Sequence, residues 1–241
     1  RAILGYLPPL AGQVRLGASV KLGYYAQDQQ VLDFESTPFE TLREVAVMSD
    51  TEIRSFLHYF LFAGDEVFVP IGSLSYGERA RLALARLVAM GCNFLVLDEP
   101  TNGLDPEGIA EMRELILKIG AAGKTIILAS HILDEVEKIC SHVVMLKQGE
   151  MVYNGSMTDL LLQRKSYKIM ADDQEKLISV LQGIPSVKIL SRDSDSVMVE
   201  LDDPLTGTDL NRMIAEKGIY LSELHAYQKS LETIFLERMK L

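Results

Sequence analysis

Between residues 93 and 149, short apolar segments alternate with amphipathic ones, and this alternation restricts the fold more than any other feature. The apolar runs NFLVLD (93–98), TIILAS (125–130) and HVVMLKQG (142–149) predict strands. The periodicity of residues 106–119 and 133–140 predicts a helix between each pair of strands. Strands and helices that alternate through short links predict an α/β fold with a largely parallel sheet.

The residues before this region predict a mixture of elements. The expected elements are a helix end over residues 1–4, strands over 13–16 and 20–27, a helical stretch from about 37 to 62, a loop over 64–73 and a helix from about 76 to 90. EMVYNG (150–155) is expected to form a hairpin with the strand that precedes it.

A different pattern begins near Lys165. Strands and helices follow one another there in the order β-α-β-β-α-β, which is the split βαβ arrangement of ferredoxin-like domains. A last amphipathic helix, SLETIFLERM, ends the chain as given. The sequence therefore predicts an α/β domain over residues 1–160, with a helical subdomain at about 34–92, and a small α+β accessory domain over 165–241.

Composition excludes some classes of protein. The 241 residues carry a net charge of −10, and nucleic acid is not expected as a partner because binding to phosphates relies on clustered Lys and Arg. No apolar stretch approaches the ~18 residues that predict a membrane span. Cys92 and Cys140 have no CxxC partner, which favours structural thiols in a reducing compartment.

Two carboxylates follow the strand over residues 93–98. In open α/β sheets, ligands bind at the carboxyl ends of the strands, where Asp98 and Glu99 are expected to lie. Asp98 is suited to hold Mg²⁺, and Glu99 to polarise a water that attacks a phosphoryl group. Two acidic residues in an exposed turn would give the same pattern.

A helix start with phosphate-binding character occurs at SLSYGE (73–78). Ser75 and Glu78 fit a capping box, and Gly77 permits close approach of a ligand to the backbone. A well-capped surface helix has the same features, so this segment alone does not establish a site.

His131 and Gln27 each follow a predicted strand. If the strands are parallel neighbours, His131 lies at the same sheet edge as Asp98 and Glu99 and is placed to contact a terminal phosphate. A structural role is the alternative for His131. Gln27 either contacts the metal or the attacking water, or simply closes a turn.

Taken together, the order and spacing of these segments resemble the nucleotide-binding domain of ABC ATPases, which has a P-loop NTPase-like core. The matching segments are YYAQD (the Q-loop), LSYGE (the signature, usually LSGGQ or LSGGE), LVLDEP (Walker B), NGLD (the D-loop) and SH (the switch histidine). The match covers residues 1 to about 155. Tyr76 stands where the family usually has glycine, and we expect its side chain to crowd the phosphate and weaken the affinity of the signature for it.

The resemblance implies a role for each matching residue. Asp98 and Gln27 would contact Mg²⁺, Glu99 would be the catalytic base, and His131 would hold the γ-phosphate of ATP. Ser75 and Gly77 of the signature would serve the nucleotide of a second ABC ATPase domain in a head-to-tail dimer, and Glu78 of the signature and Asp105 of the D-loop would also be nucleotide-binding residues. A transmembrane permease would be the other partner, at the cytoplasmic face of a membrane, and would dock on the helical segment 34–72.

One motif of the family has no counterpart. The 241 residues contain no G-x-x-x-x-G-K-[ST] phosphate loop, and the resemblance places RAILG (1–5) on the helix that follows this loop. We therefore expect an N-terminally truncated ABC ATPase core with little affinity for ATP and no hydrolysis as this chain alone.

Two parts of the chain resemble two different branches of the ABC ATPase family. Residues 13–102 resemble ABC-F proteins, the soluble translation-factor branch, whereas residues 103–241 resemble the ATP-binding subunit of a multidrug-type exporter. One hypothesis is a chimera joined at LDEPTN (97–102), for which poor packing near residues 95–130 would be evidence; one divergent family is the alternative. The leading function is the ATP-binding subunit of an ABC transporter, and the alternatives are an ABC-F-like factor acting on the ribosome and a non-hydrolysing truncated domain.

Overall fold

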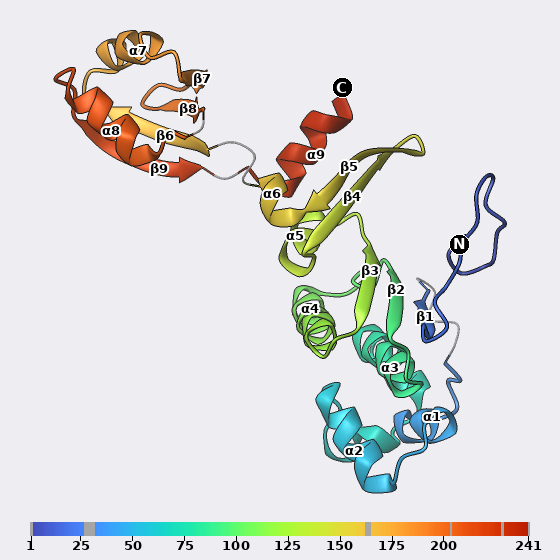
Figure 1. The fold of residues 1–241 in the computed structure, drawn as a ribbon. Helices are drawn as coiled ribbons and strands as arrows, with labels where there is room; N and C mark the ends of the chain where they lie inside the picture. Colours follow the sequence, from blue (N-terminus) through green and yellow to red (C-terminus); the bar gives the residue numbers. More distant parts are fainter. Residues whose placement is uncertain (1, 27–31, 162–164, 203, 228, 241) are drawn as a thin grey trace. The chain divides into compact units, whose positions relative to one another are not determined.

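The computed structural model describes residues 2–26, 32–161, 165–202, 204–227 and 229–240 (Figure 1). Contacts within the chain group it into two compact units, Arg1–Ile139 and Cys140–Leu241, and each unit is described by itself. The domain boundary expected near residues 160–165 stays a prediction.

The first unit is built on a three-stranded parallel sheet. Its strands are β1 (Leu22–Tyr25), β2 (Phe94–Asp98) and β3 (Thr125–Ala129), in the order β1-β2-β3. Phe94 pairs with Leu22 on one side and with Thr125 on the other, and both pairings are parallel. The parallel arrangement expected from the strand and helix alternation is thus confirmed for these strands.

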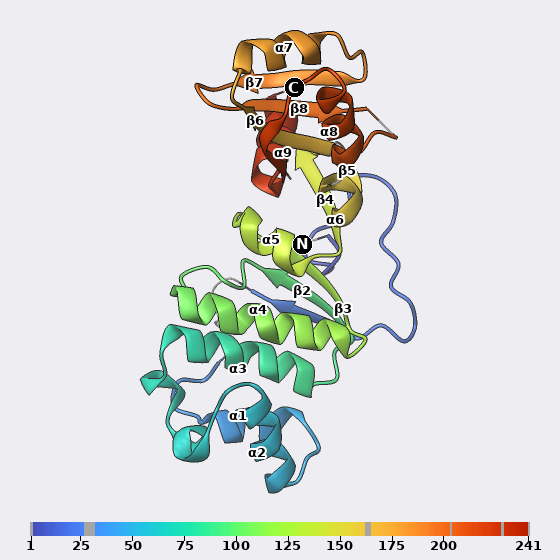
Figure 2. The same cartoon turned by 90° about the vertical axis from the view of Figure 1, so that its left-hand side faces the viewer.

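Five α-helices accompany this sheet in the described part of the first unit. They are α1 (Pro38–Val45), α2 (Asp50–Tyr59), α3 (Tyr76–Ala89), α4 (Pro106–Ala121) and α5 (Leu133–Ile139), with 3₁₀ helices at Gly64–Phe68 and Ile71–Ser73. Figure 2 shows α4 running along one face of the sheet, with α3 beside it. Apolar residues of α3 and α4 share one hydrophobic core with the sheet, as amphipathic helices do in α/β proteins.

Residues on both sides of Asn102 belong to one hydrophobic core. Leu95 and Leu97 of β2 are fully buried in the same cluster as Met112 and Leu115 of α4. β2 and α4 therefore pack together, whereas β3 (Thr125–Ala129) has no fully buried residue and Ile127 is 40% exposed. The chimera hypothesis stays a prediction.

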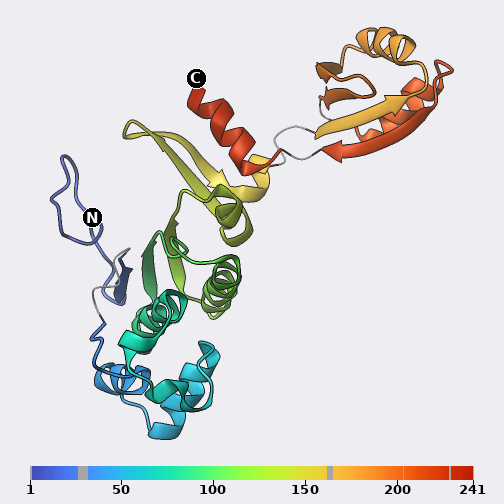
Figure 3. The same cartoon turned by 180° about the vertical axis from the view of Figure 1, so that it is seen from behind.

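The second unit begins with a hairpin and continues into a larger antiparallel sheet. The hairpin pairs β4 (His142–Lys147) with β5 (Glu150–Ser156), as expected, and α6 (Met157–Leu161) follows it. The remaining elements are β6 (Lys165–Ala171), α7 (Gln174–Gln182), β7 (Val187–Arg192), β8 (Val197–Leu201), α8 (Gly207–Ala215), β9 (Leu221–Tyr227) and α9 (Leu231–Lys240) (Figure 3).

The strands of this larger sheet lie in the order β7-β8-β6-β9, and every pairing is antiparallel. The first strand of the series is therefore central and the last strand lies beside it, as in the split βαβ arrangement. The expected β-α-β-β-α-β element order over this region is confirmed. Ile169, Leu177, Val199 and Leu210 are fully buried in its own core.

Two expectations near the start of the chain are wrong. Residues 2–5 form a turn rather than the end of a helix, and the N–H of Gly5 donates to the carbonyl of Ala2 at 3.1 Å. Residues 13–16 are exposed and form no strand, and the second expected strand is shortened to β1. Period-2 alternation is a weak signal where no neighbouring strand accepts the backbone hydrogen bonds.

The helical stretch expected over residues 37–62 is divided into α1 and α2. Ser49 begins α2 with a capping box, in which its N–H donates to Glu52 Oε2 at 2.7 Å. Ala46 ends α1 in an extended conformation. The apolar periodicity continues across this break, and the S-x-x-E signal at residues 49–52 is the feature that identifies it. The loop expected over residues 64–73 contains the two 3₁₀ helices.

Candidate functional site

The carboxyl ends of β2 and β3 lie side by side at one edge of the sheet. Asp98 is the last residue of β2 and pairs with Ala129, the last residue of β3. Glu99 follows directly, and its N–H donates to the carbonyl of Ala129 at 2.8 Å. The sheet therefore places Asp98 and Glu99 next to the segment that carries His131.

His131 contacts Glu99 directly. Its Nδ1 lies 2.8 Å from Glu99 Oε2, and its side chain is 67% exposed whereas that of Glu99 is 21% exposed. Glu99 has φ +50°, a left-handed conformation that is uncommon outside glycine and that often marks functional turns. The expected proximity of His131 to Glu99 is confirmed, while the chemical roles of both residues stay predictions.

Tyr24, which the sequence analysis did not single out, also belongs to this edge. Its hydroxyl donates a hydrogen bond to Asp98 Oδ2 at 3.0 Å across the β1–β2 pair. Its place in a strand next to the predicted Q-loop is the only sequence signal that would have pointed to it. Gln27 lies outside the described residues, so its expected contacts with the metal or water are not described here.

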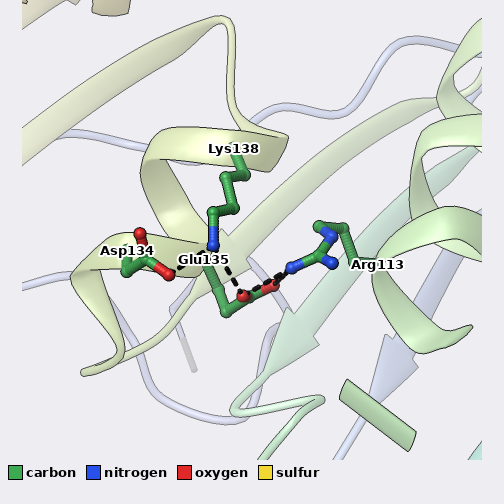
Figure 4. Close-up of polar contacts among 4 residues, drawn as sticks. All are labelled: Arg113, Asp134, Glu135 and Lys138. Carbon is green, nitrogen blue, oxygen red and sulfur yellow. Dashed lines mark hydrogen bonds and ion pairs between the residues drawn. The ribbon is translucent and has the colours of Figure 1, made fainter. Parts of the chain in front are cut away.

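A charge cluster links α4 and α5 (Figure 4). The guanidinium Nη1 of Arg113 donates to both carboxylate oxygens of Glu135, at 2.7 and 2.9 Å. Lys138 Nζ lies 3.7 Å from Glu135 and also pairs with Asp134. Since α4 follows the turn after Glu99 and α5 follows His131, this cluster ties together the two helices that support the site.

The start of α3 forms the expected capping box. Ser75 Oγ accepts from the N–H of Glu78 at 3.2 Å, and Glu78 Oε2 accepts from the N–H of Ser75 at 2.6 Å. Burial alone would raise the pKa of Glu78, but the bonds from Ser75 and the charges of Arg81 and Arg79 hold it below its usual value. Ser75 and Glu78 are thus bonded to each other, as in a structural cap.

Tyr76, at the position where the resemblance expects glycine, lies against the turn that precedes α4. A Cβ built on Gly103 would lie 3.3 Å from Tyr76 Cε1, and Gly103 itself has φ +76°. Gly77 has space around it, since the nearest atom to a Cβ there would be Leu104 Cδ2 at 3.8 Å. Tyr76 therefore connects the signature segment to the D-loop segment within this chain.

Asp105 is the N-cap of α4. Its Oδ1 accepts from the N–H of Gly108 at 2.9 Å, and Pro106 occupies the first turn of the helix. This contact explains Asp105 as a structural residue, and it does not test the expected role of Asp105 toward a nucleotide.

The described side chains at this sheet edge fit a magnesium site, but they do not fit a metal site made of protein ligands alone. No group of three or more His, Cys, Asp or Glu side chains within the described ranges is arranged to hold a metal. Within the described ranges, these side chains therefore do not form a complete metal-binding site by themselves. Asp98 offers a hard oxygen ligand, which fits Mg²⁺, an ion that binds one or two carboxylates and takes its other ligands from phosphate and water.

The remaining structural findings concern membranes and thiols. Among the helices of the described residues, none combines the length and the apolar character that crossing a bilayer requires. Burial raises the pKa of both Cys92 and Cys140, which agrees with unreactive structural thiols.

Comparison with known proteins identifies the family. Residues 1–102 match the family model described as ABC transporter. An ABC transporter ATP-binding protein of Listeria monocytogenes is 32% identical over 180 residues, which cover 72% of this chain and 67% of that protein. The bacitracin transport ATP-binding protein BcrA of Bacillus licheniformis is 27% identical over an alignment that covers 98% of this chain and 82% of BcrA.

The chain belongs to the family of ABC transporter ATP-binding proteins. The P-loop NTPase type of α/β fold follows from this membership. Other relatives are much longer: the ATP-binding protein YdiF of Bacillus subtilis is 35% identical over 152 residues, which cover 63% of this chain and 23% of YdiF. The chain thus spans less than a quarter of YdiF.

Proposed function

We propose that the edge formed by Asp98, Glu99 and His131 is the metal-binding and hydrolytic part of an ATP site. The observation that carries this proposal is the 2.8 Å contact between His131 Nδ1 and Glu99 Oε2, beside the strand end at Asp98. A carboxylate held next to an imidazole is suited to orient and deprotonate a water molecule. His131, which is exposed, is free to turn toward a phosphate that enters the site.

In this proposal Asp98 is the protein ligand of Mg²⁺, whose charge would neutralise the phosphate oxygens of bound ATP. Glu99 accepts the proton of the attacking water. His131 donates a hydrogen bond to the terminal phosphate. Gln27 is proposed as a further contact of the metal on the strength of the family pattern alone.

A second ATPase domain would complete the site. We propose that Ser75, Gly77 and Glu78, together with Asp105, contact the nucleotide bound by a partner domain in a head-to-tail dimer. The position of this segment at the start of α3 and the open space around Gly77 support this assignment. Tyr76 would lie beside the same nucleotide, with its ring packed against Gly103.

The whole protein is proposed to couple ATP binding and hydrolysis to transport through a membrane permease, at the cytoplasmic face of the membrane. Two relatives support this reading, since both are named as transporter ATP-binding proteins. The permease would dock on the helical segment 34–72, and residues 165–241 would form the accessory domain. The ABC-F alternative has less support, because the alignment with BcrA covers 98% of the chain.

The phosphate loop of the family is a further requirement of the proposed ATP site. The 241 residues contain no G-x-x-x-x-G-K-[ST] stretch, and we propose that tight ATP binding needs this loop in addition to the edge described. The test is a calorimetric titration of Mg·ATP into two proteins. One is this chain, and the other, the loop-extended chain, carries a strand and a G-x-x-x-x-G-K-[ST] phosphate loop at its N-terminus.

The proposal predicts Mg-dependent binding by the loop-extended chain and much weaker binding by the chain alone. Asp98→Asn in the loop-extended chain should remove the dependence on Mg²⁺ and leave metal-free ATP binding. A folded loop-extended chain that binds no ATP, or whose Asp98→Asn variant keeps the full dependence on Mg²⁺, would contradict the proposal. Co-sedimentation with ribosomes would instead support the ABC-F alternative.

A further inference from the structure

A hydrogen bond from a neighbouring strand engages one of the two carboxylate oxygens of Asp98. The donor is the hydroxyl of Tyr24, 3.0 Å from Asp98 Oδ2 and 74 positions away in the sequence. Both side chains are partly buried at the same edge of the sheet. A charge-assisted bond of this kind fixes the orientation of a carboxylate more firmly than a bond between neutral groups does.

The register of the sheet explains why Tyr24 reaches Asp98. Tyr24 pairs with Val96 in the parallel β1–β2 ladder. Side chains two residues apart on a strand point to the same face, so Asp98 lies on the face of Val96 and Tyr24. The next residue, Tyr25, pairs with Leu97 on the opposite face and is buried in the core.

Three further contacts support Tyr24 and the start of its strand. The ring of Tyr6 lies edge-on to the ring of Tyr24, with centroids 6.1 Å apart and planes at 72°. At the start of β1, the N–H of Lys21 donates to Asn93 Oδ1 at 2.8 Å and the N–H of Asn93 donates to the carbonyl of Lys21 at 3.0 Å. These contacts support the strand and the ring that present the hydroxyl.

We propose that Tyr24 is a positioning residue for Asp98. Its hydroxyl occupies Oδ2 and thereby turns Oδ1 toward the edge of the sheet, where it is available to a divalent cation. The inference rests on the proposed role of Asp98 as a metal ligand. Residues that hydrogen-bond to metal ligands orient them, and their loss typically weakens metal binding by about 10- to 100-fold.

The first test needs no ligand. A double-mutant cycle between Tyr24→Phe and Asp98→Ala should show that the two side chains are coupled, by about threefold to tenfold in the unfolding equilibrium constant. Tyr25→Phe is the matched control, since it removes a hydroxyl from the opposite face of the same strand, and it should show no coupling to Asp98→Ala. Equal effects of Tyr24→Phe with and without Asp98 would overturn the proposal.

The second test uses Mn²⁺ as a probe, with ATP, on the whole 241-residue chain. Paramagnetic broadening of the backbone amide signals of Asp98 and Glu99 reports a bound ion even when binding is weak. Tyr24→Phe should raise the Mn²⁺ concentration needed for half-maximal broadening by about 10-fold or more, and Tyr25→Phe should leave it unchanged.

The Mn²⁺ experiment distinguishes a failure of the positioning role of Tyr24 from a failure of the metal role of Asp98. Broadening in the wild type that Tyr24→Phe leaves unchanged would overturn the positioning role alone. A wild type that shows no broadening near Asp98 at any Mn²⁺ concentration, both in this chain and in the loop-extended chain, would overturn the metal role of Asp98, and the positioning role with it, even if the cycle shows coupling.

Discussion

His131 and Glu99 come from different loops, and their side chains meet with Nδ1 of His131 2.8 Å from Oε2 of Glu99. The side chain of His131 is 67% exposed, so water screens this contact. His131→Ala should therefore change the free energy of unfolding by less than about 1 kcal/mol. Urea unfolding at neutral pH measures this change.

A matched control exists in the second unit. His225 is also 67% exposed and lies 3.1 Å from the carboxylate of Glu223. His225→Ala should have an equally small effect on stability. Only His131→Ala should slow ATP hydrolysis by the loop-extended chain, and a similar loss of hydrolysis in His225→Ala would argue against a specific role for His131.

The pair of Arg113 and Glu135 should contribute more to stability than the exposed contacts do. The Glu135 side chain is only 7% exposed and accepts two hydrogen bonds from Arg113. Glu135→Ala leaves the guanidinium without its main partner, and it should lower the free energy of unfolding by about 2–4 kcal/mol.

Asp134→Ala is the control for this prediction, because the Asp134 side chain is 72% exposed. Its cost should stay below about 1 kcal/mol. Equal costs for Glu135→Ala and Asp134→Ala in urea unfolding would show that the Arg113–Glu135 pair does not hold α4 and α5 together.

The capping box of α3 should make stability depend on pH. The pKa of Glu78 in the folded chain lies below its usual value of 4.5, because Ser75 hydrogen-bonds to the ionised carboxylate. A lowered pKa means that the contribution of Glu78 is complete above about pH 5 and is lost as the pH falls through the pKa of the folded state.

Glu78→Gln tests this expectation. The wild type should be more stable than Glu78→Gln by about 0.5–1 kcal/mol at neutral pH, and the difference should shrink toward zero at about pH 3. Glu107→Gln, in the exposed first turn of α4, is the control. A difference that grows as the pH falls would contradict the assigned direction of the pKa.

The sequence predicted those parts of the fold whose signals are long or buried. α3 and α4 have sustained helical periodicity, and β2 is a buried run, so all three were placed within about two residues of their observed ends. Residues 13–16 alternate in the same manner as a strand. In the structure they are exposed, and nothing in a local pattern records whether a partner strand is present.

In the candidate site, too, some contacts could be predicted from the sequence and others could not. The meeting of Glu99 and His131 follows from parallel strands, whose carboxyl ends must lie at one edge. The bond from Tyr24 to Asp98 depends on the register between β1 and β2, which the sequence does not specify. The burial of Glu135 could have been predicted from the sequence, because this acidic residue lies on the apolar face of α5 with Val136 and Ile139.

The most direct test of the central claim, that Glu99 at this sheet edge is the base for ATP hydrolysis, is a single-turnover measurement on the loop-extended chain. Wild type and Glu99→Gln are compared with the protein in saturating excess over Mg·ATP. We expect wild type and Glu99→Gln to bind ATP equally and the hydrolysis rate of Glu99→Gln to be about 10²- to 10⁴-fold lower. Equal hydrolysis rates in the two proteins would contradict it.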